Sequence, residues 1–252
     1  MINIDLLPAV NSTEAAPKLS DSYGFMNTRE IIDHMGTLGF EVVKAKQVIA
    51  RNKDNMAYKK HLLNLRKVDS KPVLGEVHPE IVILNSHEGT ASLKMMFGLF
   101  RLVCANGLIV SAGIDELDVK LRHNMINVTK LNESVEYITA HTDTVINKLE
   151  AMQAKKLDYT DALTFAMDAM ALRFTDKTPI DAVQLLASRR QEDEDDTLWK
   201  VFNRVQENLV VGGLSGRFED GRRFTTRPVN RINGNVKLNQ QLWNLAEQFL
   251  AA

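Results

Sequence analysis

Hydrophobic and polar positions alternate in two neighbouring segments, residues 40–50 and 58–68, and this period of two predicts a pair of half-buried β-strands. The polar residues 51–57 between them favour an antiparallel hairpin. A third segment, residues 80–85, contains an unbroken aliphatic run, which is typical of an interior strand buried on both faces. The three segments together predict a small antiparallel sheet.

The two faces of the predicted hairpin differ in character, because successive side chains of a strand point to opposite faces. One face is expected to be apolar and to carry Val43, Ala45, Ile49, Leu63 and Leu65. The opposite face is expected to be mostly basic and to carry Lys44, Lys46, Lys60, Asn64 and Arg66. The pattern therefore predicts a sheet with one cationic side.

Further along, a polar turn leads into an apolar run that starts near Ala91. Thr90 or Ser92 is a suitable N-cap for a helix there. Apolar residues then recur at intervals of three and four, as on one face of a helix, at Leu93, Met96, Phe97, Phe100 and Cys104. A short helix after Asn27 and a returning strand at 108–110 complete the predicted order of the N-terminal half.

Helical periodicity dominates the second half, over residues 115–157 with a break near 123–130, and over 159–173, 179–190, 198–211 and 236–250. The expected fold class is therefore α+β, with a small antiparallel sheet (a helix-strand-strand-strand-helix core) and a mostly helical C-terminal half. The expected parts are a flexible leader (1–22), the sheet core (23–113) and a helical region (114–252) that packs on the core as one domain.

Composition narrows the class of protein. The chain has 252 residues, 44% of them hydrophobic, and a net charge of -1. It shows neither a signal peptide nor a long apolar segment, so we expect a cytoplasmic protein without a membrane partner. The single cysteine, Cys104, excludes an internal disulfide and a multi-thiolate zinc site. We expect neither a metal nor another cofactor.

Positive charge is concentrated in two places. Residues 40–71 contain nine basic and three acidic side chains, a net charge of +6. A cationic sheet face can follow a phosphate backbone, whereas lysines on an edge hairpin can also serve only to prevent aggregation. The second segment, 216–237, is rich in arginine and includes Phe218 and Phe224. Arginine suits phosphate or carboxylate recognition, and the two rings can stack on bases or anchor the loop to the core.

The turn Asn85-Ser86-His87-Glu88-Gly89 offers backbone N–H groups and a histidine. We interpret it first as a structural corner and second as a contact for phosphate or another ligand, with Ser86, His87 and Arg101 as the candidates. Catalysis by His87 and Glu88 would need partners that the sequence does not reveal.

Motifs of nucleotide hydrolases, dehydrogenases and esterases are absent, so we expect a protein that catalyses no reaction. One enzymatic alternative is a metal-dependent nuclease that uses Glu88, Asp193 or Asp195. The acidic run 191–196 is a weak cation site, because it lacks the ligand spacing of a known metal loop. It can also complement a helix dipole or pair with an arginine segment.

Two long segments resemble a family of phage- and plasmid-like proteins that is catalogued as a domain of unknown function. The first is NSHEGTASLKMMFGLFRLVCANGLIV, which is similar to the family's signature of an N-S-H-[DE]-G turn followed by G-L-F-R-L-V-C-x-N-G-L. The second is TLWKVFNRVQENLVVGGLSGR with RRFTTRPVNRINGNVKLNQQLWNLAEQF, which is similar to its C-terminal half. The resemblance spans residues 25–250 and implies a mobile element in a bacterial cytoplasm, without supplying catalytic residues.

The order of a helix, three antiparallel strands and a long helix is also similar to the core of phage single-strand annealing recombinases. This resemblance implies a basic groove that holds single-stranded DNA. We therefore expect a nucleic-acid-binding protein of a phage or plasmid, acting on single-stranded DNA in recombination or replication. The expected contacts are Lys44, Lys46, Lys59, Lys60, Arg66, Lys67, Arg217, Arg222, Arg223 and Arg227. The alternative is an anti-restriction or anti-CRISPR type of inhibitor that binds a host protein, and either protein could be a homo-oligomer.

Overall fold

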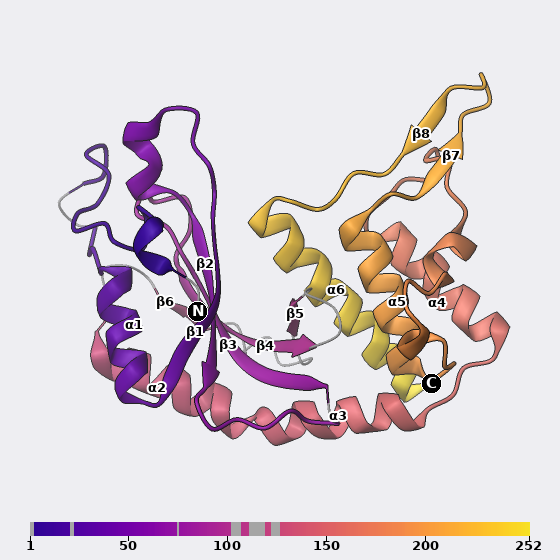
Figure 1. Ribbon diagram of the computed structural model, residues 1–252, viewed down its shortest axis with the longest axis horizontal. Coiled ribbons are helices and arrows are strands. Elements are labelled where there is room, and N and C mark those ends of the chain that lie inside the picture. The colour runs from indigo at the N-terminus through magenta and orange to yellow at the C-terminus, as the bar shows by residue number, and fades with distance from the viewer. Residues whose placement is uncertain (1–2, 21–22, 75, 102–106, 111–118, 122–126) are drawn as a thin grey trace. The chain divides into compact units, whose positions relative to one another are not determined.

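The strands of the N-terminal half form one antiparallel sheet (Figure 1). The computed structural model describes residues 3–20, 23–74, 76–101, 107–110, 119–121 and 127–252. The strands of this sheet are β1 (Phe40–Gln47), β2 (His61–Lys67), β3 (Val77–Asn85), β4 (Leu93–Arg101), β5 (Gly107–Val110) and β6 (Val119–Leu121). They follow the order β1-β2-β3-β4-β5, and β6 also pairs with β4. The predicted α+β class, hairpin and returning strand are confirmed.

The helix predicted from residue 91 to 104 is wrong, because Leu93–Arg101 forms strand β4. β4 pairs with β3 along its whole length, and Phe97 lies opposite Ile81. Nearly every residue of β4 is buried, so the alternation that marks a half-exposed strand is missing from its sequence. The spacing of three and four residues was a by-product of an unbroken apolar run. Cys104 lies outside the described residues.

Two helices cover one face of the sheet, and hydrophobic residues of β2 and β3 point to it. The pairings of Leu63 with Ile83 and of Leu65 with Ile81 place these four fully or nearly buried side chains on that face. Helix α1 (Thr28–Thr37) packs on β1, and helix α2 (Val128–Ala140) contacts β4. The side chains that the two helices bury are chiefly Ile31, Met35, Leu131, Val135 and Ile138. We call this side of the sheet the apolar face.

One extra residue changes the phase of β1. Val42 pairs with Leu65 and Lys44 pairs with Asn64, so Val43 is a β-bulge between them. The bulge leaves Val42 and Ala45 on the apolar face and Lys44 on the opposite face. The predicted alternation from Val43 to Ile49 is therefore wrong in detail. Ile49 lies beyond the strand and is 85% exposed.

The first residues of the chain pack against this sheet unit. Ala9 and Val10 are fully buried, and the Ala9 amide donates to the Gln47 side chain at 3.0 Å. A short 3₁₀ helix, η1 (Ile4–Leu6), lies at the start of the segment, and a second one, η2 (Lys53–Tyr58), connects β1 to β2. The flexibility expected for residues 1–22 stays a prediction, although the described part contributes to a core.

The second half contains helices α3 (Thr142–Ala154), α4 (Tyr159–Ala171), α5 (Leu198–Val211) and α6 (Ile232–Ala251). Aromatic residues from three of them pack together, with the rings of Trp199 and Phe202 stacked 5.6 Å apart and Trp243 in edge contact with Phe202. Two helical predictions are wrong. Val119–Leu121 is a strand, and the only helical element within residues 179–190 is the 3₁₀ helix η4 (Ala182–Leu186), with a second one, η5 (Gln191–Asp193), directly after them.

The chain divides into two compact units, one covering residues 1–110 and 114–142 and the other 111–113 and 143–252. We call them the sheet unit and the helical unit. The boundary expected at 113 and 114 lies outside the described residues, and the packing of both parts as one domain stays a prediction. None of the helices in the described residues is long and apolar enough to cross a membrane.

Candidate nucleic-acid interface

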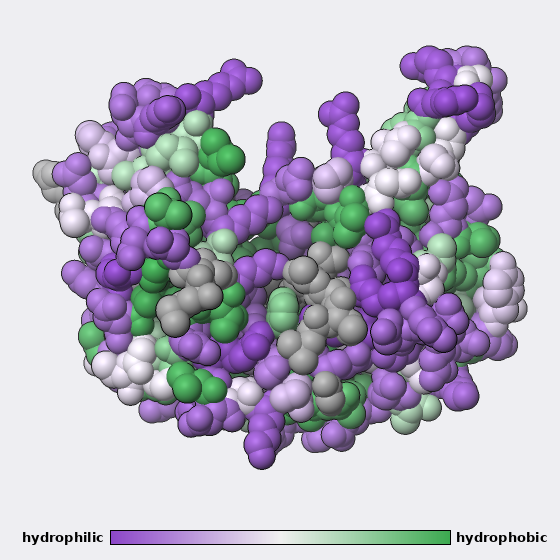
Figure 2. All heavy atoms as spheres, viewed as in Figure 1, coloured by the Kyte–Doolittle hydropathy of each residue, from purple (hydrophilic) through white to green (hydrophobic). Residues whose placement is uncertain are grey.

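A two-stranded ribbon carries the arginine-rich segment of the helical unit. Its strands are β7 (Ser215–Arg217) and β8 (Arg223–Thr225), and Figure 2 shows hydrophilic side chains gathered over its tip. Arg217 lies directly opposite Arg223 in the antiparallel register, so their side chains share one face of the ribbon. Both residues are exposed, as is Arg227 just beyond the ribbon.

Glycines fix the base and the tip of this ribbon. Gly212 ends α5 with a φ of 73°, and a Cβ there would lie 2.8 Å from the backbone of Arg227. Gly216 has no room for a side chain, because a Cβ would collide with the Pro179 carbonyl. At the tip Gly221 has a φ of 82°, a left-handed conformation that suits glycine in a tight turn. The base of the ribbon is therefore held against the loop that contains Pro179.

Aromatic rings and one ion pair organise the ribbon tip. The rings of Phe218 and Phe224 meet edge to face at 5.6 Å. Arg222 lies over the Phe218 ring at 5.0 Å and also forms a 2.6 Å ion pair with Asp220. Asp220 thus partly neutralises Arg222, and Phe218 offers an aromatic surface at a cationic tip.

Arg217, Arg223 and Arg227 differ from Arg222 in their surroundings. Within the part of the chain that the structure describes, no carboxylate lies within ion-pair distance of these three side chains. The acidic run 191–196 pairs elsewhere, with Asp193 lying 3.5 Å from Arg190. Asp196 likewise lies 3.5 Å from Arg204. Asp193 and Asp196 therefore serve local structure around α5.

Basic residues of the β1–β2 hairpin are divided between two faces of the sheet. The register places Lys44, Lys46 and Arg66 on the face opposite the apolar one. Lys67 pairs with Phe40 and points to the apolar face, where its ammonium lies 5.5 Å from the Phe40 ring centroid. Lys60 lies just before β2 and is half-buried. Lys67, one of the predicted nucleic-acid contacts, therefore lies on the other side of the sheet from Lys44, Lys46 and Arg66.

Acidic residues from neighbouring segments reduce the charge of this hairpin. Lys59 forms a 2.7 Å ion pair with Glu88 of the polar turn. Arg66 forms a 2.8 Å ion pair with Glu80, whose side chain is fully buried and also accepts a hydrogen bond from Asn64. Burial raises the pKa of the Glu80 carboxyl, while the bonds from Arg66 and Asn64 and the charge of nearby Lys44 oppose that rise. Arg66 is thus part of a buried polar network.

The polar turn at residues 85–89 is a buried structural corner. Ser86 and His87 have no exposed surface. Thr28 Oγ1 lies 2.8 Å from His61 Nε2 and 3.2 Å from His87 Nε2, and it accepts a hydrogen bond from the Asn85 amide at 3.0 Å. Sequence spacing could not reveal this cluster, because its members come from α1, β2 and the end of β3.

The same turn holds the N-terminal segment in place. His87 Nε2 lies 3.0 Å from the Ala9 carbonyl, and the His87 carbonyl accepts a hydrogen bond from the Ala16 amide at 2.9 Å. Tyr23 donates its hydroxyl to the Ser86 carbonyl at 2.9 Å. These bonds support the structural interpretation of the turn over the catalytic one.

Arg101 is not brought to this turn. It lies at the far end of β4, eight residues beyond Leu93 or roughly 26 Å along an extended strand. There it is buried and forms a 2.9 Å ion pair with Glu76. Ser86, His87 and Arg101 therefore do not form one contact site within the sheet unit.

Lowering the pH should destabilise the sheet unit through His61. Burial lowers the pKa of His61 from 6.5 to about 4, so the native state favours the neutral imidazole. This contribution to stability is present above pH 6.5 and is lost as the pH falls from 6.5 through about 4, by about 3 kcal/mol in total. Urea unfolding between pH 7 and pH 4 measures the loss, and a His61→Asn chain should show a flatter dependence.

The carboxylates considered for a nuclease site belong to different units. Glu88 is in the sheet unit and is paired with Lys59, whereas Asp193 and Asp195 are in the helical unit. Among the described residues, no group of three or more His, Cys, Asp or Glu side chains is arranged to hold a metal ion.

Comparison with known proteins gives a family. A family model described as "Domain of unknown function (DUF932)" matches residues 18–243. The chain belongs to the DUF932 family. Among its DUF932 relatives, UPF0380 protein YafZ of Escherichia coli (strain K12) is 37% identical over 246 residues, which are 97% of this chain and 89% of YafZ. UPF0380 protein YfjQ of the same organism is 36% identical over equal shares. No solved structure matches this DUF932 chain.

Proposed function

We propose that this protein binds nucleic acid through its arginine ribbon, favours single-stranded DNA and catalyses no reaction. The observation that carries the proposal is the cross-strand pair Arg217 and Arg223. Like charges directly opposite one another destabilise a strand pair, and a two-stranded ribbon is only marginally stable by itself. A polyanion bound across both guanidinium groups would remove that repulsion.

The rest of the ribbon supports the same interpretation. Ser215 and Thr225 lie opposite one another on the face that Arg217 and Arg223 share, and their hydroxyl groups can donate to phosphate oxygens. Phe218 adds a ring on which an unpaired base can stack. Arginines that can bind phosphate on one face of the ribbon, together with a ring on the other face at its tip that can stack on a base, favour a single strand.

Lysines of the sheet unit provide a second, weaker contribution. Lys44 and Lys46 share a face of β1, and exposed Arg51 and Lys53 follow in the connection to β2. The net positive charge of this hairpin is lowered by two ion pairs, Arg66 with Glu80 and Lys59 with Glu88. We therefore assign the main contact to the ribbon and a supporting one to Lys44 and Lys46, and we propose a role in recombination or replication of a mobile element.

Salt dependence tests this proposal. Fluorescence anisotropy with a labelled single-stranded oligonucleotide should show binding at 50 mM salt that weakens at least roughly tenfold at 200 mM, because bound cations release condensed counterions. A duplex of the same sequence should bind more weakly. No binding at low salt, or binding that is indifferent to salt, would refute the function. A host protein that stays bound to this chain after nuclease treatment would instead favour the alternative function, an inhibitor that binds a host protein.

A further inference from the structure

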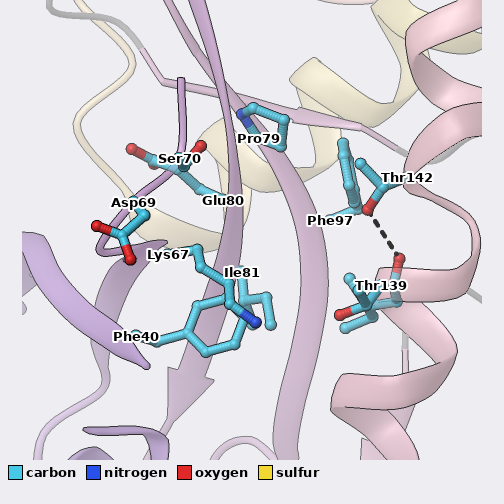
Figure 3. Close-up of a pocket in the computed structure, with 11 residues that line it drawn as sticks. Phe40, Lys67, Asp69, Ser70, Pro79, Glu80, Ile81, Phe97, Thr139 and Thr142 are labelled. Carbon is cyan, nitrogen blue, oxygen red and sulfur yellow. Dashed lines mark hydrogen bonds between the residues drawn. The ribbon is translucent and has the colours of Figure 1, made fainter. Parts of the chain in front are cut away.

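A cavity of about 380 Å³ opens on the apolar face of the sheet unit, beside the end of α2. Figure 3 shows the rings of Phe40 and Phe97 on different sides of it, with Lys67 beside Phe40 and Thr139 on the helical side. A neighbouring cavity of about 360 Å³ shares Phe40, Lys67 and Thr139. The volume lies within the range of about 300–1,000 Å³ that is usual for small organic ligands.

The interior of this cavity suits a flat, uncharged ring. Phe40 supplies accessible apolar surface, and the nearly fully buried Phe97, Ile81 and Ile138 close the cavity behind it. Glu80 lines the cavity, yet its carboxylate bonds to Asn64 and Arg66 on the opposite face of the sheet. The carboxylate of Glu80 therefore does not make the cavity acidic.

Two exposed groups of opposite charge stand at the rim. The Lys67 ammonium lies near the edge of the cavity over the Phe40 ring, and Asp69 follows two residues later. A lysine binds phosphate as a point charge, whereas a carboxylate accepts hydrogen bonds from the exocyclic amine of a base such as cytosine. A ligand that combines an aromatic ring, an amine and a phosphate matches all three features.

We propose that this cavity binds one nucleotide, with its base against the Phe40 ring, its amine at Asp69 and its phosphate at Lys67. A free nucleotide and a nucleotide within a single strand share the same chemistry. The assignment of a strand as the source of the bound nucleotide rests on the proposed function. Bases of a duplex are stacked and paired, so they cannot enter without being flipped out. The cavity therefore gives a physical reason for a preference for single strands.

Photo-crosslinking with 5-iodocytosine tests the site directly. One arm uses free 5-iodo-dCMP, a second uses an oligonucleotide with a single 5-iodocytosine, and a third uses the same base within a duplex. Irradiation followed by peptide mass spectrometry should place the adduct on the peptide that contains Phe40. An adduct in the first two arms indicates that free nucleotides enter, and an adduct in the second alone indicates that the strand is the source. The duplex should give at most a trace.

Two variants make the assignment specific. Phe40→Leu keeps an apolar side chain but removes the ring, and it should lower the adduct yield at least roughly fivefold, as expected for loss of base stacking. Lys67→Ala should lower the adduct yield with 5-iodo-dCMP. It should leave the yield with 5-iodo-deoxycytidine, which lacks the phosphate, unchanged. The matched control is Lys71→Ala, because Lys71 is exposed, carries the same charge and does not line the cavity.

The results separate this site from the proposed function. An oligonucleotide that binds but crosslinks only to Phe218 or Phe224 would overturn the nucleotide cavity and leave the ribbon as the interface. A yield unaffected by Phe40→Leu would overturn it as well. An adduct at Phe40 from 5-iodo-dCMP, without any binding of oligonucleotides, would uphold the cavity and refute the proposed function.

Discussion

A chain that carries both Arg217→Glu and Arg223→Glu will bind a single-stranded oligonucleotide on the order of 100-fold more weakly than the wild type at 50 mM salt. The two side chains lie opposite one another on one exposed face of the β7–β8 ribbon, so the double change turns a cationic contact into a repulsive one. The logarithmic salt slope should fall by about 2, because two phosphates are no longer neutralised by the ribbon. Anisotropy titrations at several salt concentrations measure both quantities.

The matched control for this double change is Lys156→Glu with Lys177→Glu, which alters the charge equally at exposed positions of the same unit. It should leave the affinity within a few fold. The ribbon variant itself should melt at an unchanged temperature, since one like-charge pair replaces another. Equal losses in the two double variants would mean that only total charge matters, and the ribbon would lose its assignment.

Replacing Glu80 by alanine should destabilise the sheet unit by about 3 kcal/mol, because it leaves the half-buried Arg66 without its carboxylate. The change also removes the acceptor of the Asn64 hydrogen bond from the interior of the sheet. Urea unfolding followed by circular dichroism measures the loss, and the midpoint should fall without a large change in its slope.

Glu136→Ala is the comparison for this substitution, since Glu136 is an exposed acidic residue of α2 in the same unit. It should change the free energy of unfolding by no more than about 0.5 kcal/mol. A Glu80→Ala chain as stable as Glu136→Ala would show that the Arg66 guanidinium finds enough water to dispense with its partner. Arg66 would then return to the set of residues available to a ligand.

The sheet itself was predictable as far as its residues alternate. β1 and β2 each have an exposed or polar side, so the period of two in residues 40–68 identified them. β4 has no such side, and its sequence fits a helix and a fully buried strand equally well. Only its pairing with β3 decides between them, and no local pattern contains that information.

The site was predictable in its parts but not in its partners. Arginines of the ribbon are exposed, as a polar, glycine-containing segment suggests. Lys59 is neutralised by Glu88, which lies 29 residues further along the chain, and Arg66 by Glu80, which lies 14 residues further along. Counting charges within residues 40–71 could not include them. The cavity beside Phe40 likewise needs Ile138, which lies almost a hundred residues away.

The hydrogen bonds between the N-terminal segment and the His87 turn predict how substitutions near the start of this protein affect its stability. Ala9 fills interior space and its carbonyl meets an imidazole, so a bulky residue there would act like a substitution in the hydrophobic core. A chain trimmed to begin just before α1 would lose the Ala9 and Ala16 contacts of His87 and open the Thr28–His61–His87 cluster to water. Although residues 3–20 have the composition of a loosely ordered tail, Ala9 and Val10 are buried against the sheet.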